Sequence, residues 1–406
     1  MNAPTLENPP GIRPHAMQLS GEARHLKRSV MRDLLALASA PDMLSLAGGL
    51  PCTDALPTEA LRGCLAEVFV RDGGRALQYS PPFAPLREWI ADYMRARGVV
   101  CTSDDIFLTN GNQQGLTIVS RLLLDPGAPV VIEDATFTGI QQITAGRGAE
   151  VIAVPVDPAY GVDVDALERA FRSVPRPRFA ALIPDFHNPL GVSLTADQRA
   201  HIADLSARYG VPIIEDDPYS ALRFAGDPVP PIKAYDRADT IFYLGSFSKM
   251  LAPALRLGWI VAPRDLMPRI TAIRESIDLE TSTLIQRAVF AFLDRGLLPA
   301  HLDRLNSINQ ARCEALVSAL DDHLCGIASW TAPQGGLFVW LTLPEAIDTW
   351  SLFERASAAN VIYIPGSAFS VTGGHRNAMR LNFSSLAPDA IAEAVRRLSR
   401  VIHETL

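Results

Sequence analysis

Short apolar runs alternate with longer mixed stretches through the first two thirds of the chain. An alternation of this kind predicts an α/β fold, in which a mostly parallel sheet is covered by helices. The runs that we expect to be buried strands are residues 130–132, 151–154, 180–183, 211–214, 241–244 and 257–261. Most of the chemically suggestive residues follow such runs, where open α/β sheets place their ligands.

The pattern changes in the last third of the chain. Residues from about 278 to 320 read as a long helical stretch. Two further strand-like runs follow, at residues 335–341 and 379–383, and they predict a smaller α/β domain. The chain contains no internal repeat and no low-complexity tract.

Composition narrows the class of protein. The chain has 406 residues, of which 48% are hydrophobic and 20% are charged, so it is long enough for one large core and a smaller one. The formal net charge is −7, and no long run of one sign occurs. Both features argue against a nucleic-acid or membrane surface and favour a small-molecule ligand.

The cysteines and the N-terminus bear on location. The five cysteines are scattered and lack CxxC spacing, so neither a disulfide framework nor a zinc or other metal site is expected. Residues 1–20 lack the apolar core of a signal peptide, and no later apolar stretch is long enough to span a bilayer. We therefore expect a cytoplasmic protein.

One short segment carries the strongest chemical signal. Residues 246–256 combine the amine of Lys249 with the hydroxyls of Ser246 and Ser248 and the guanidinium of Arg256. A lysine amine can form a Schiff base with a carbonyl, while hydroxyls and a guanidinium suit phosphate oxygens. Pyridoxal 5'-phosphate (PLP) needs both. A surface lysine in a polar turn is the plain alternative, but the segment follows the buried run 241–244.

Other polar residues after strand-like runs could address the PLP ring. Asp216 could keep the pyridine nitrogen protonated, and Tyr219 could donate to the phenolic oxygen, so that the ring withdraws electrons from a substrate carbanion. Asn188 lies in a proline-bracketed turn and could face the same oxygen. His187 has no evident partner and is expected to be structural. Taken alone, residues 215–219 would read as a solvated acidic turn.

A glycine-containing helix start completes the candidate site. Gly111, Asn112 and Gln113 open a predicted helix after the run 106–108. Glycine permits close approach of backbone amides to an anion there, so the turn predicts a phosphate cradle. A plain capped helix start remains the alternative.

These segments, in this order, resemble the class I/II aminotransferases of PLP fold type I. The best fit is to the subgroup of 2-aminoadipate, kynurenine and aromatic aminotransferases. Residues 44–51 (LSLAGGLP) are similar to the first motif of that subgroup. Residues 77–80 and 86–87 are similar to the segment that follows this motif in the subgroup. The resemblance runs from about residue 29 to the end. It implies a seven-stranded, mostly parallel sheet in a large domain at 50–295, a small α/β domain at 296–406, and a segment 1–49 that contributes to the small domain and a pocket lid.

The resemblance also implies roles for single residues. Lys249 forms the Schiff base, Asp216 pairs with the pyridinium, and Asn188 and Tyr219 contact the phenolic oxygen. Phe137 falls where relatives place a ring-stacking tyrosine. The phosphate-holding set is Gly111, Asn112, Gln113, Ser246, Ser248 and Arg256, joined by Tyr79 from a neighbouring subunit, so a homodimer with shared sites is implied.

For the substrate, the resemblance points to Arg380 as the residue that grips the α-carboxylate, with Gly49 and Asn188 beside it. A buried ion pair is the alternative role for Arg380. Arg32, on a predicted N-terminal helix, could meet a distal carboxylate, which favours 2-aminoadipate or glutamate as one substrate. Aromatic and branched-chain amino acids remain open as alternatives. Residues 81–84 and Leu190 depart from the family pattern and affect pocket shape.

The expected function is transamination between an L-amino acid and a 2-oxo acid by a ping-pong mechanism in amino acid metabolism. Lys249 acts first as nucleophile, then as general base and acid. Another PLP reaction (decarboxylation, oxidation, racemisation or elimination) stays open, because one fold hosts many chemistries. A non-enzymatic PLP-sensing regulator domain is disfavoured, because only 44 residues precede Ser45 and no helix-turn-helix is apparent in them.

Overall fold

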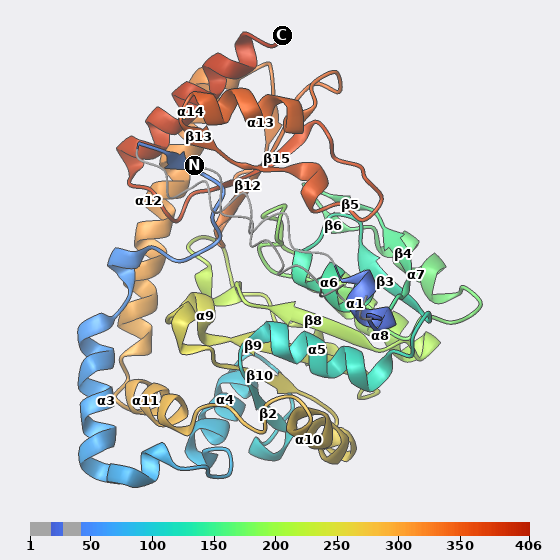
Figure 1. Cartoon of the computed structure of the whole chain (residues 1–406), viewed down its shortest axis with the longest axis vertical. Helices are drawn as coiled ribbons and strands as arrows, with labels where there is room; N and C mark the ends of the chain where they lie inside the picture. The colour runs from blue at the N-terminus through green and yellow to red at the C-terminus, as the bar shows by residue number, and fades with distance from the viewer. Residues whose placement is uncertain (1–17, 27–41) are drawn as a thin grey trace, which may run out of the picture.

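The computed structural model describes residues 18–26 and 42–406. Its centre is a seven-stranded sheet with the order β2-β10-β9-β8-β7-β3-β4 (Figure 1). All neighbouring pairs are parallel except those of β10, which is antiparallel to both β2 and β9. The predicted mostly parallel α/β sheet is therefore confirmed. Its strands are β2 (Ile106–Thr109), β3 (Pro129–Glu133), β4 (Glu150–Val154), β7 (Ala180–Leu182), β8 (Ile213–Asp217), β9 (Ile241–Ser246) and β10 (Gly258–Val261).

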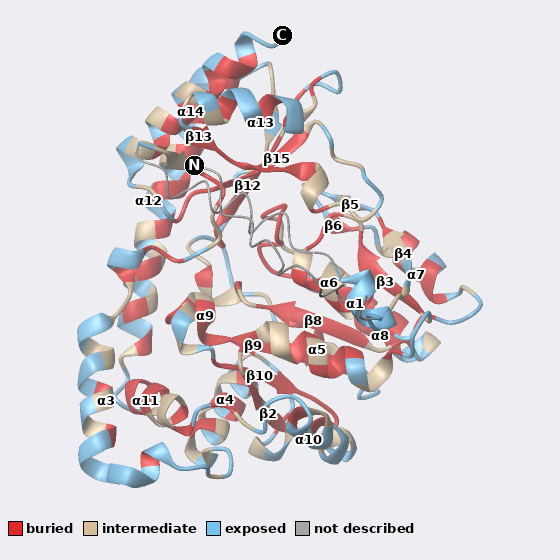
Figure 2. Ribbon diagram, viewed as in Figure 1, coloured by how far each residue is buried: buried red, intermediate tan, exposed pale blue. Residues whose placement is uncertain are grey.

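Helices cover both faces of this sheet because side chains alternate along each strand. Phe242 and Leu244 of β9 pack with α5 (Asn112–Leu123) and α6 (Thr138–Gly146) on one face, together with α10 (Met267–Glu275). Ile241 and Tyr243 point to the other face. There the covering helices are α4 (Ala84–Ala96), α7 (Val164–Phe171), α8 (Ala196–Tyr209) and α11 (Thr283–Asp294). Figure 2 shows that the central strands are buried along their length.

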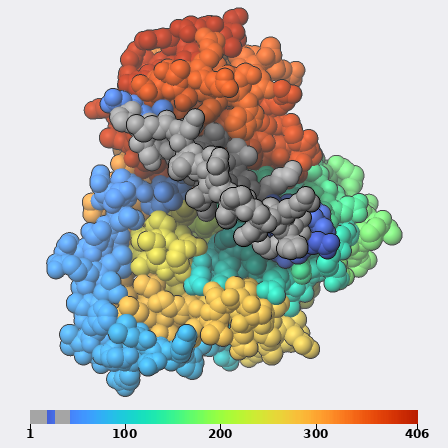
Figure 3. Space-filling view, viewed as in Figure 1, coloured from blue at the N-terminus to red at the C-terminus, as the bar shows by residue number. Residues whose placement is uncertain are grey.

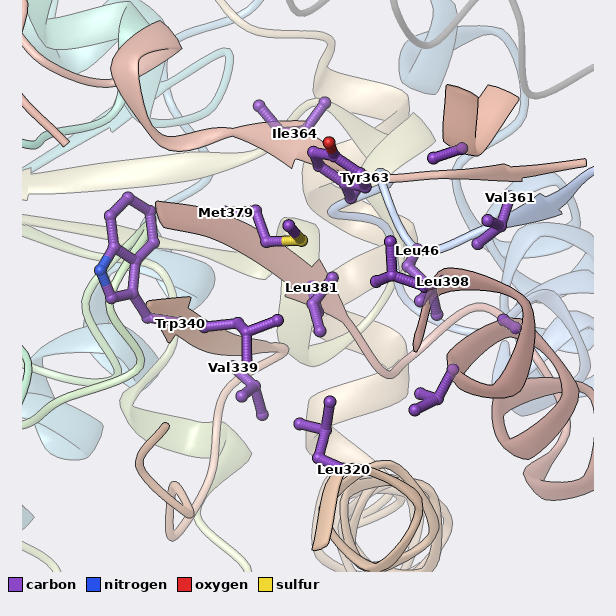
Figure 4. Packing of buried hydrophobic residues seen from close by; sticks show 14 of the residues in the cluster. Leu46, Leu320, Val339, Trp340, Val361, Tyr363, Ile364, Met379, Leu381 and Leu398 are labelled. Atoms are coloured by element: carbon purple, nitrogen blue, oxygen red, sulfur yellow. The ribbon is translucent and has the colours of Figure 1, made fainter. Parts of the chain in front are cut away.

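A second unit forms from the C-terminal part of the chain. Its four-stranded sheet has the order β11 (Ser329–Trp330), β12 (Phe338–Thr342), β15 (Ala378–Asn382), β14 (Ile364–Pro365), and α12 (Leu298–Leu324), α13 (Thr349–Ala358) and α14 (Pro388–His403) pack beside it. Figure 4 shows Leu381 of β15, Leu398 of α14 and Leu46 in one core. Two strands of the small domain were anticipated from the residues alone, and both are present.

The N-terminal segment joins this second unit. β1 (Leu44–Ser45) pairs in parallel with β13 (Val361–Ile362), and Leu46 and Ala47 are fully buried in the same core. This arrangement brings Gly49 to the junction of the two units. The domain limits at residues 49 and 295 remain a prediction.

The remaining elements are short or peripheral. They are α1 (Gly21–His25), α3 (Thr58–Asp72), α9 (Phe247–Met250), and a hairpin of β5 (Val156–Asp157) and β6 (Gly161–Val162). Among the helices within residues 18–26 and 42–406, none is long and apolar enough to cross a membrane.

Candidate active site

A cavity of about 360 Å³ lies where the carboxyl ends of β8 and β9 meet the small unit. Parallel strand ends converge at one edge of a sheet, so residues that follow separate strands meet there. The lining residues are Gly49, Leu50, Asn112, Gln113, Phe137, Thr138, Ile183, Asn188, Asp216, Pro218, Tyr219, Ser246, Ser248, Lys249, Pro253, Arg256, Phe338 and Arg380. Most of the site residues expected from the sequence are thus brought together.

Lys249 stands on α9, directly after β9. Its Nζ donates a 2.7 Å hydrogen bond to the carbonyl oxygen of Gly49, so the amine bridges the large unit and the N-terminal segment. Burial, followed by the positive charges of Arg380 and Arg256, lowers the pKa of Lys249 from 10.5 to about 8. A substantial fraction of this amine is therefore neutral at mildly alkaline pH, and the neutral amine is the form that acts as nucleophile and base.

The three consecutive acids at the end of β8 have different partners. Glu215 accepts from the main-chain amides of Ile232 and Lys233, at 2.7 and 2.9 Å. Asp217 accepts from Arg97 at 2.8 Å. Because strand side chains alternate, Asp216 points the opposite way, into the cavity. All three are buried, so the alternative of a solvated acidic turn is wrong.

Asp216 is held in a setting that disfavours its charge. Burial raises its pKa from 3.8 to about 7, and the Asp217 and Glu133 carboxylates add to that rise. The Asn112 side chain opposes it by donating a 2.6 Å hydrogen bond from Nδ2 to Oδ1. A cationic partner at this carboxylate would relieve the cost of burying the charge.

A hydrogen-bonded chain crosses the cavity from the small unit. Arg380 of β15 donates from Nη1 to Asn188 Oδ1 at 2.7 Å, and Asn188 Nδ2 is 3.4 Å from the Tyr219 hydroxyl. Arg380 also donates from Nη2 to the carbonyl oxygens of Ala47 and Gly48, at 2.7 and 3.0 Å. Burial lowers the pKa of Arg380 to about 10, which still leaves it cationic at neutral pH.

Two aromatic rings flank the Arg380 guanidinium. The guanidinium carbon is 4.2 Å from the Phe338 ring centre and 4.9 Å from that of Phe369. Such contacts stabilise a desolvated cation and fix its plane. No motif in the sequence indicated these two rings. Phe338 lay in a predicted strand, but the run itself carries no signal of which side chain faces the cavity.

The start of α5 is shaped for an anion. Gly111 has φ of +82°, and a Cβ there would lie 2.7 Å from Arg256 Nη2. Arg256 donates from Nη2 to the Asn110 carbonyl at 2.8 Å and approaches Ser248 Oγ at 3.4 Å. Free amides of a helix start, two hydroxyls and a guanidinium converge at this end, and that donor set fits a phosphate group.

The Phe137 ring lies against a second glycine, Gly139, which no motif in the sequence indicated. A Cβ at Gly139 would lie 2.3 Å from Phe137 Cε1 and 2.1 Å from Gln113 Oε1. Gln113 Nε2 donates to the Gly139 carbonyl at 3.3 Å. The absence of a side chain at Gly139 therefore lets the Phe137 ring and the Gln113 amide lie side by side at the cavity wall.

His187 has a partner, contrary to the expectation from sequence. Its Nε2 is 3.1 Å from Glu133 Oε2, and both side chains are buried. Glu133 also accepts from the main-chain amide of Ile183 at 3.1 Å. The main-chain amide of Leu190 donates to His187 Nδ1 at 3.4 Å, so His187 contacts both Glu133 and the turn that contains Asn188. These contacts give a physical basis to the structural role expected for His187.

One expected residue that the structure describes, Tyr79, lies apart from this cavity. Tyr79 does not line it, and 81% of Tyr79 is exposed in the single chain. Arg32 and its predicted helix lie outside the described residues.

Comparison with known proteins identifies the family. Residues 41–398 match the aminotransferase class I and II family along almost the whole chain. The chain belongs to the class I and II aminotransferases. It is 35% identical to an aromatic-amino-acid aminotransferase of Thermococcus litoralis, over 100% of this chain and 97% of that protein.

Solved structures of aminotransferases have the same fold as this chain. The kynurenine aminotransferase of Pyrococcus horikoshii, in a complex with PMP, superposes with a TM-score of 0.91 at 34% identity, covering 96% of this chain and 97% of that one. The α-aminoadipate aminotransferase of Thermus thermophilus, complexed with N-(5'-phosphopyridoxyl)-L-leucine, gives 0.88 at 33% identity, over 95% and 97%. The chain is therefore a PLP-dependent aminotransferase of fold type I, as its sequence predicted.

Proposed function

We propose that transamination takes place in the cavity between β8, β9 and the small unit, with Lys249 as the residue that bonds to the aldehyde of PLP. The observation that carries this proposal is the setting of the Lys249 amine. It lies in one cavity with a buried carboxylate, Asp216, and a buried cation, Arg380. No other described lysine lines this cavity.

The residues present fit PLP at each of its polar groups. Ser246, Ser248, Arg256 and the amides of residues 111–113 would hold the phosphate, as argued from the donor set. Asp216 would pair with the ring nitrogen, and Asn188 and Tyr219 would contact the phenolic oxygen. Phe137 would cover a face of the ring. When bound, PLP supplies an aldehyde for the amino group and a ring that withdraws electrons from the α-carbon.

Arg380 and Lys249 would act on different groups of the substrate. Arg380 would bind the α-carboxylate through a bidentate pair, for which Phe338 and Phe369 fix its plane. Once the substrate amine has replaced Lys249, Nζ is free to accept the proton from the substrate α-carbon and to return it to the cofactor carbon. The amino group would stay on the cofactor when the first 2-oxo acid leaves, and Lys249 would regain its bond to the aldehyde only at the end of the second half-reaction. Because the first product leaves before the second substrate binds, we expect ping-pong kinetics.

The chain offers a compact test because its sequence contains only three lysines, Lys27, Lys233 and Lys249. We expect Lys249→Ala to abolish 2-oxo acid release from a panel of L-amino acids. Borohydride reduction of the wild-type protein with PLP should label the peptide that contains Lys249. Lys233→Arg is the control, because Lys233 Nζ pairs with Asp236 and Asp239 at 2.8 and 3.0 Å, away from the cavity. Normal turnover by Lys249→Ala would contradict the assignment.

The same panel addresses the substrate. Glutamate and 2-aminoadipate are the donors that we propose, on the basis of Arg32. If carbon dioxide, peroxide or ammonia appeared instead of a 2-oxo acid, the site would carry a different PLP reaction.

We also propose that the active form is a homodimer in the cytoplasm, in which Tyr79 reaches the phosphate site of the partner. Helix α3 runs along one edge of the molecule (Figure 3). Large apolar side chains are exposed along α3 and the segments near it, at Phe69, Val70, Leu77, Tyr79 and Leu279. Exposed apolar residues gathered in this way mark interaction sites. A second copy of the chain would cover them.

A further inference from the structure

The side chain of Asn112 contacts Asp216, although the sequence placed Asn112 with the phosphate-holding residues. Asn112 is the first residue of α5, and its Nδ2 donates to Asp216 Oδ1 at 2.6 Å and to the Leu244 carbonyl at 3.1 Å. A carbonyl oxygen can only accept, so the amide nitrogen must face these two atoms. Both of its N–H groups are therefore committed to β8 and β9.

No other side chain within residues 18–26 and 42–406 donates a hydrogen bond to Asp216. The surrounding charges work against the carboxylate, because Asp217 and Glu133 raise its pKa in addition to burial. A buried carboxylate that loses its last donor is costly to keep charged. Among the residues that the structure describes, Asn112 thus supplies the one interaction that favours the charged form.

The seating of α5 makes this contact rigid. A Cβ at Gly115, one turn further along, would lie 2.7 Å from Leu244 Cδ2 and 3.5 Å from Ile260 Cγ1, so the helix is in close contact with the sheet. The helix start cannot move away from β9 without breaking that packing. The Asn112 amide is accordingly held at a fixed distance from the end of β8.

We propose that Asn112 is a positioning residue for Asp216: its side chain holds one carboxylate oxygen and leaves the other for the ring nitrogen of PLP, while the backbone amides of the same helix start serve the phosphate. The inference rests on the proposed role of Asp216. It assigns two tasks to one residue position, the main chain acting on the phosphate and the side chain acting on the ring.

A cofactor analogue separates these two tasks. We would measure the dissociation constants of the full chain, freed of cofactor, for PLP and for 1-deaza-PLP, in which carbon replaces the ring nitrogen. We expect Asn112→Ala to weaken PLP binding about 10-fold, the effect of losing one hydrogen bond to a charged group. Binding of 1-deaza-PLP should change less than about 2-fold, because that ring makes no charged pair with Asp216.

Asn110→Ala is the matched control. It truncates the same residue type two positions earlier in the chain, but the Asn110 side chain donates to Asp278 at 2.6 Å and does not donate to Asp216. We expect it to leave the ratio of the two dissociation constants unchanged. Asn112→Ser, which keeps a polar side chain of smaller size, provides a second variant if the alanine variant folds poorly.

The outcomes are distinct. An equal loss of affinity for both cofactors in Asn112→Ala would overturn the inference, because the side chain would then act on the phosphate. No loss of affinity for either cofactor would also overturn it, because the side chain would then contribute nothing to binding. Asp216→Asn tests the underlying assignment by itself. If that variant keeps the wild-type preference for PLP over 1-deaza-PLP, the proposed role of Asp216 fails. If it loses the preference and Asn112→Ala does not, only the inference about Asn112 fails.

Discussion

At the scale of single residues, burial favours the neutral form of both central groups of the cavity, the Lys249 amine and the Asp216 carboxyl. Burial lowers the pKa of Lys249 to about 8 and raises that of Asp216 to about 7. Desolvation penalises whichever form is charged, so an amine and a carboxyl move in opposite directions. Burying these two groups therefore lowers the free energy of unfolding of the cofactor-free protein, and this loss of stability can be measured.

We expect Lys249→Met to raise the melting temperature of the cofactor-free protein below pH 8. Between pH 8 and 10.5 the unfolded chain binds more protons than the folded one, so wild-type stability rises with pH across this window, and the penalty is full below it. The shift corresponds to roughly 3 kcal/mol at most. Thermal melts at both ends of the window check this. A melting-temperature gain that does not shrink as pH rises would contradict it.

At the scale of elements, one helix start organises much of the site. α5 contributes Asn112 and Gln113 directly, and Gly111 before it accommodates Arg256. Its position depends on Gly115, where a side chain would collide with Leu244 of β9. The close approach of helix and strand is thus a requirement of the site as well as of the core.

Gly115→Ala should weaken PLP binding and lower stability together. The added methyl group has to displace Leu244 or lift α5, at a cost of about 1–3 kcal/mol for overpacking. PLP titration and thermal melting of the same samples measure both effects. Gly63→Ala on α3 is the control, since its Cβ would meet only Arg295 Nη1, at an ordinary 3.7 Å. Unchanged affinity in Gly115→Ala would show that α5 tolerates the shift.

At the scale of the whole molecule, the cavity belongs to neither unit alone. Lys249 and Asp216 come from the large unit, Arg380 and Phe338 from the small one, and Gly49 from the N-terminal segment. The proposed dimer would add Tyr79 from a second chain. Catalysis would then depend on the relative positions of the large unit, the small unit and the N-terminal segment of one chain, and of Tyr79 from a second chain.

Mixed dimers test the shared site. We expect Lys249→Ala and Tyr79→Phe subunits, each impaired by itself, to regain activity when they are mixed and allowed to exchange. In such a hybrid one site pairs an intact Lys249 with an intact Tyr79 from the other subunit. If Tyr79 serves its own chain, no hybrid site contains both residues. The activity of the mixture would then equal the average of the two homodimers.

By itself, the sequence determined the mostly parallel sheet and several of the residues that gather at its carboxyl edge, because both depend on local signals. Lys249, Asp216 and Asn188 each follow a short apolar run, and parallel strands bring their ends to one edge. The family resemblance supplied three further predictions: the number of strands in the sheet, the role of Arg380 in binding the substrate carboxylate, and the reaction.

The tertiary structure alone decided matters that depend on contacts between distant segments. These include the aromatic rings around Arg380, the Glu133–His187 pair, and the bond from Asn112 to Asp216. From the sequence, Asp216 was chosen among three consecutive acids for what it could do for the PLP ring, and the structure shows that this side chain faces the cavity. The alternation along a strand is encoded locally, but the side on which the cavity lies is set by the packing of other elements against the sheet.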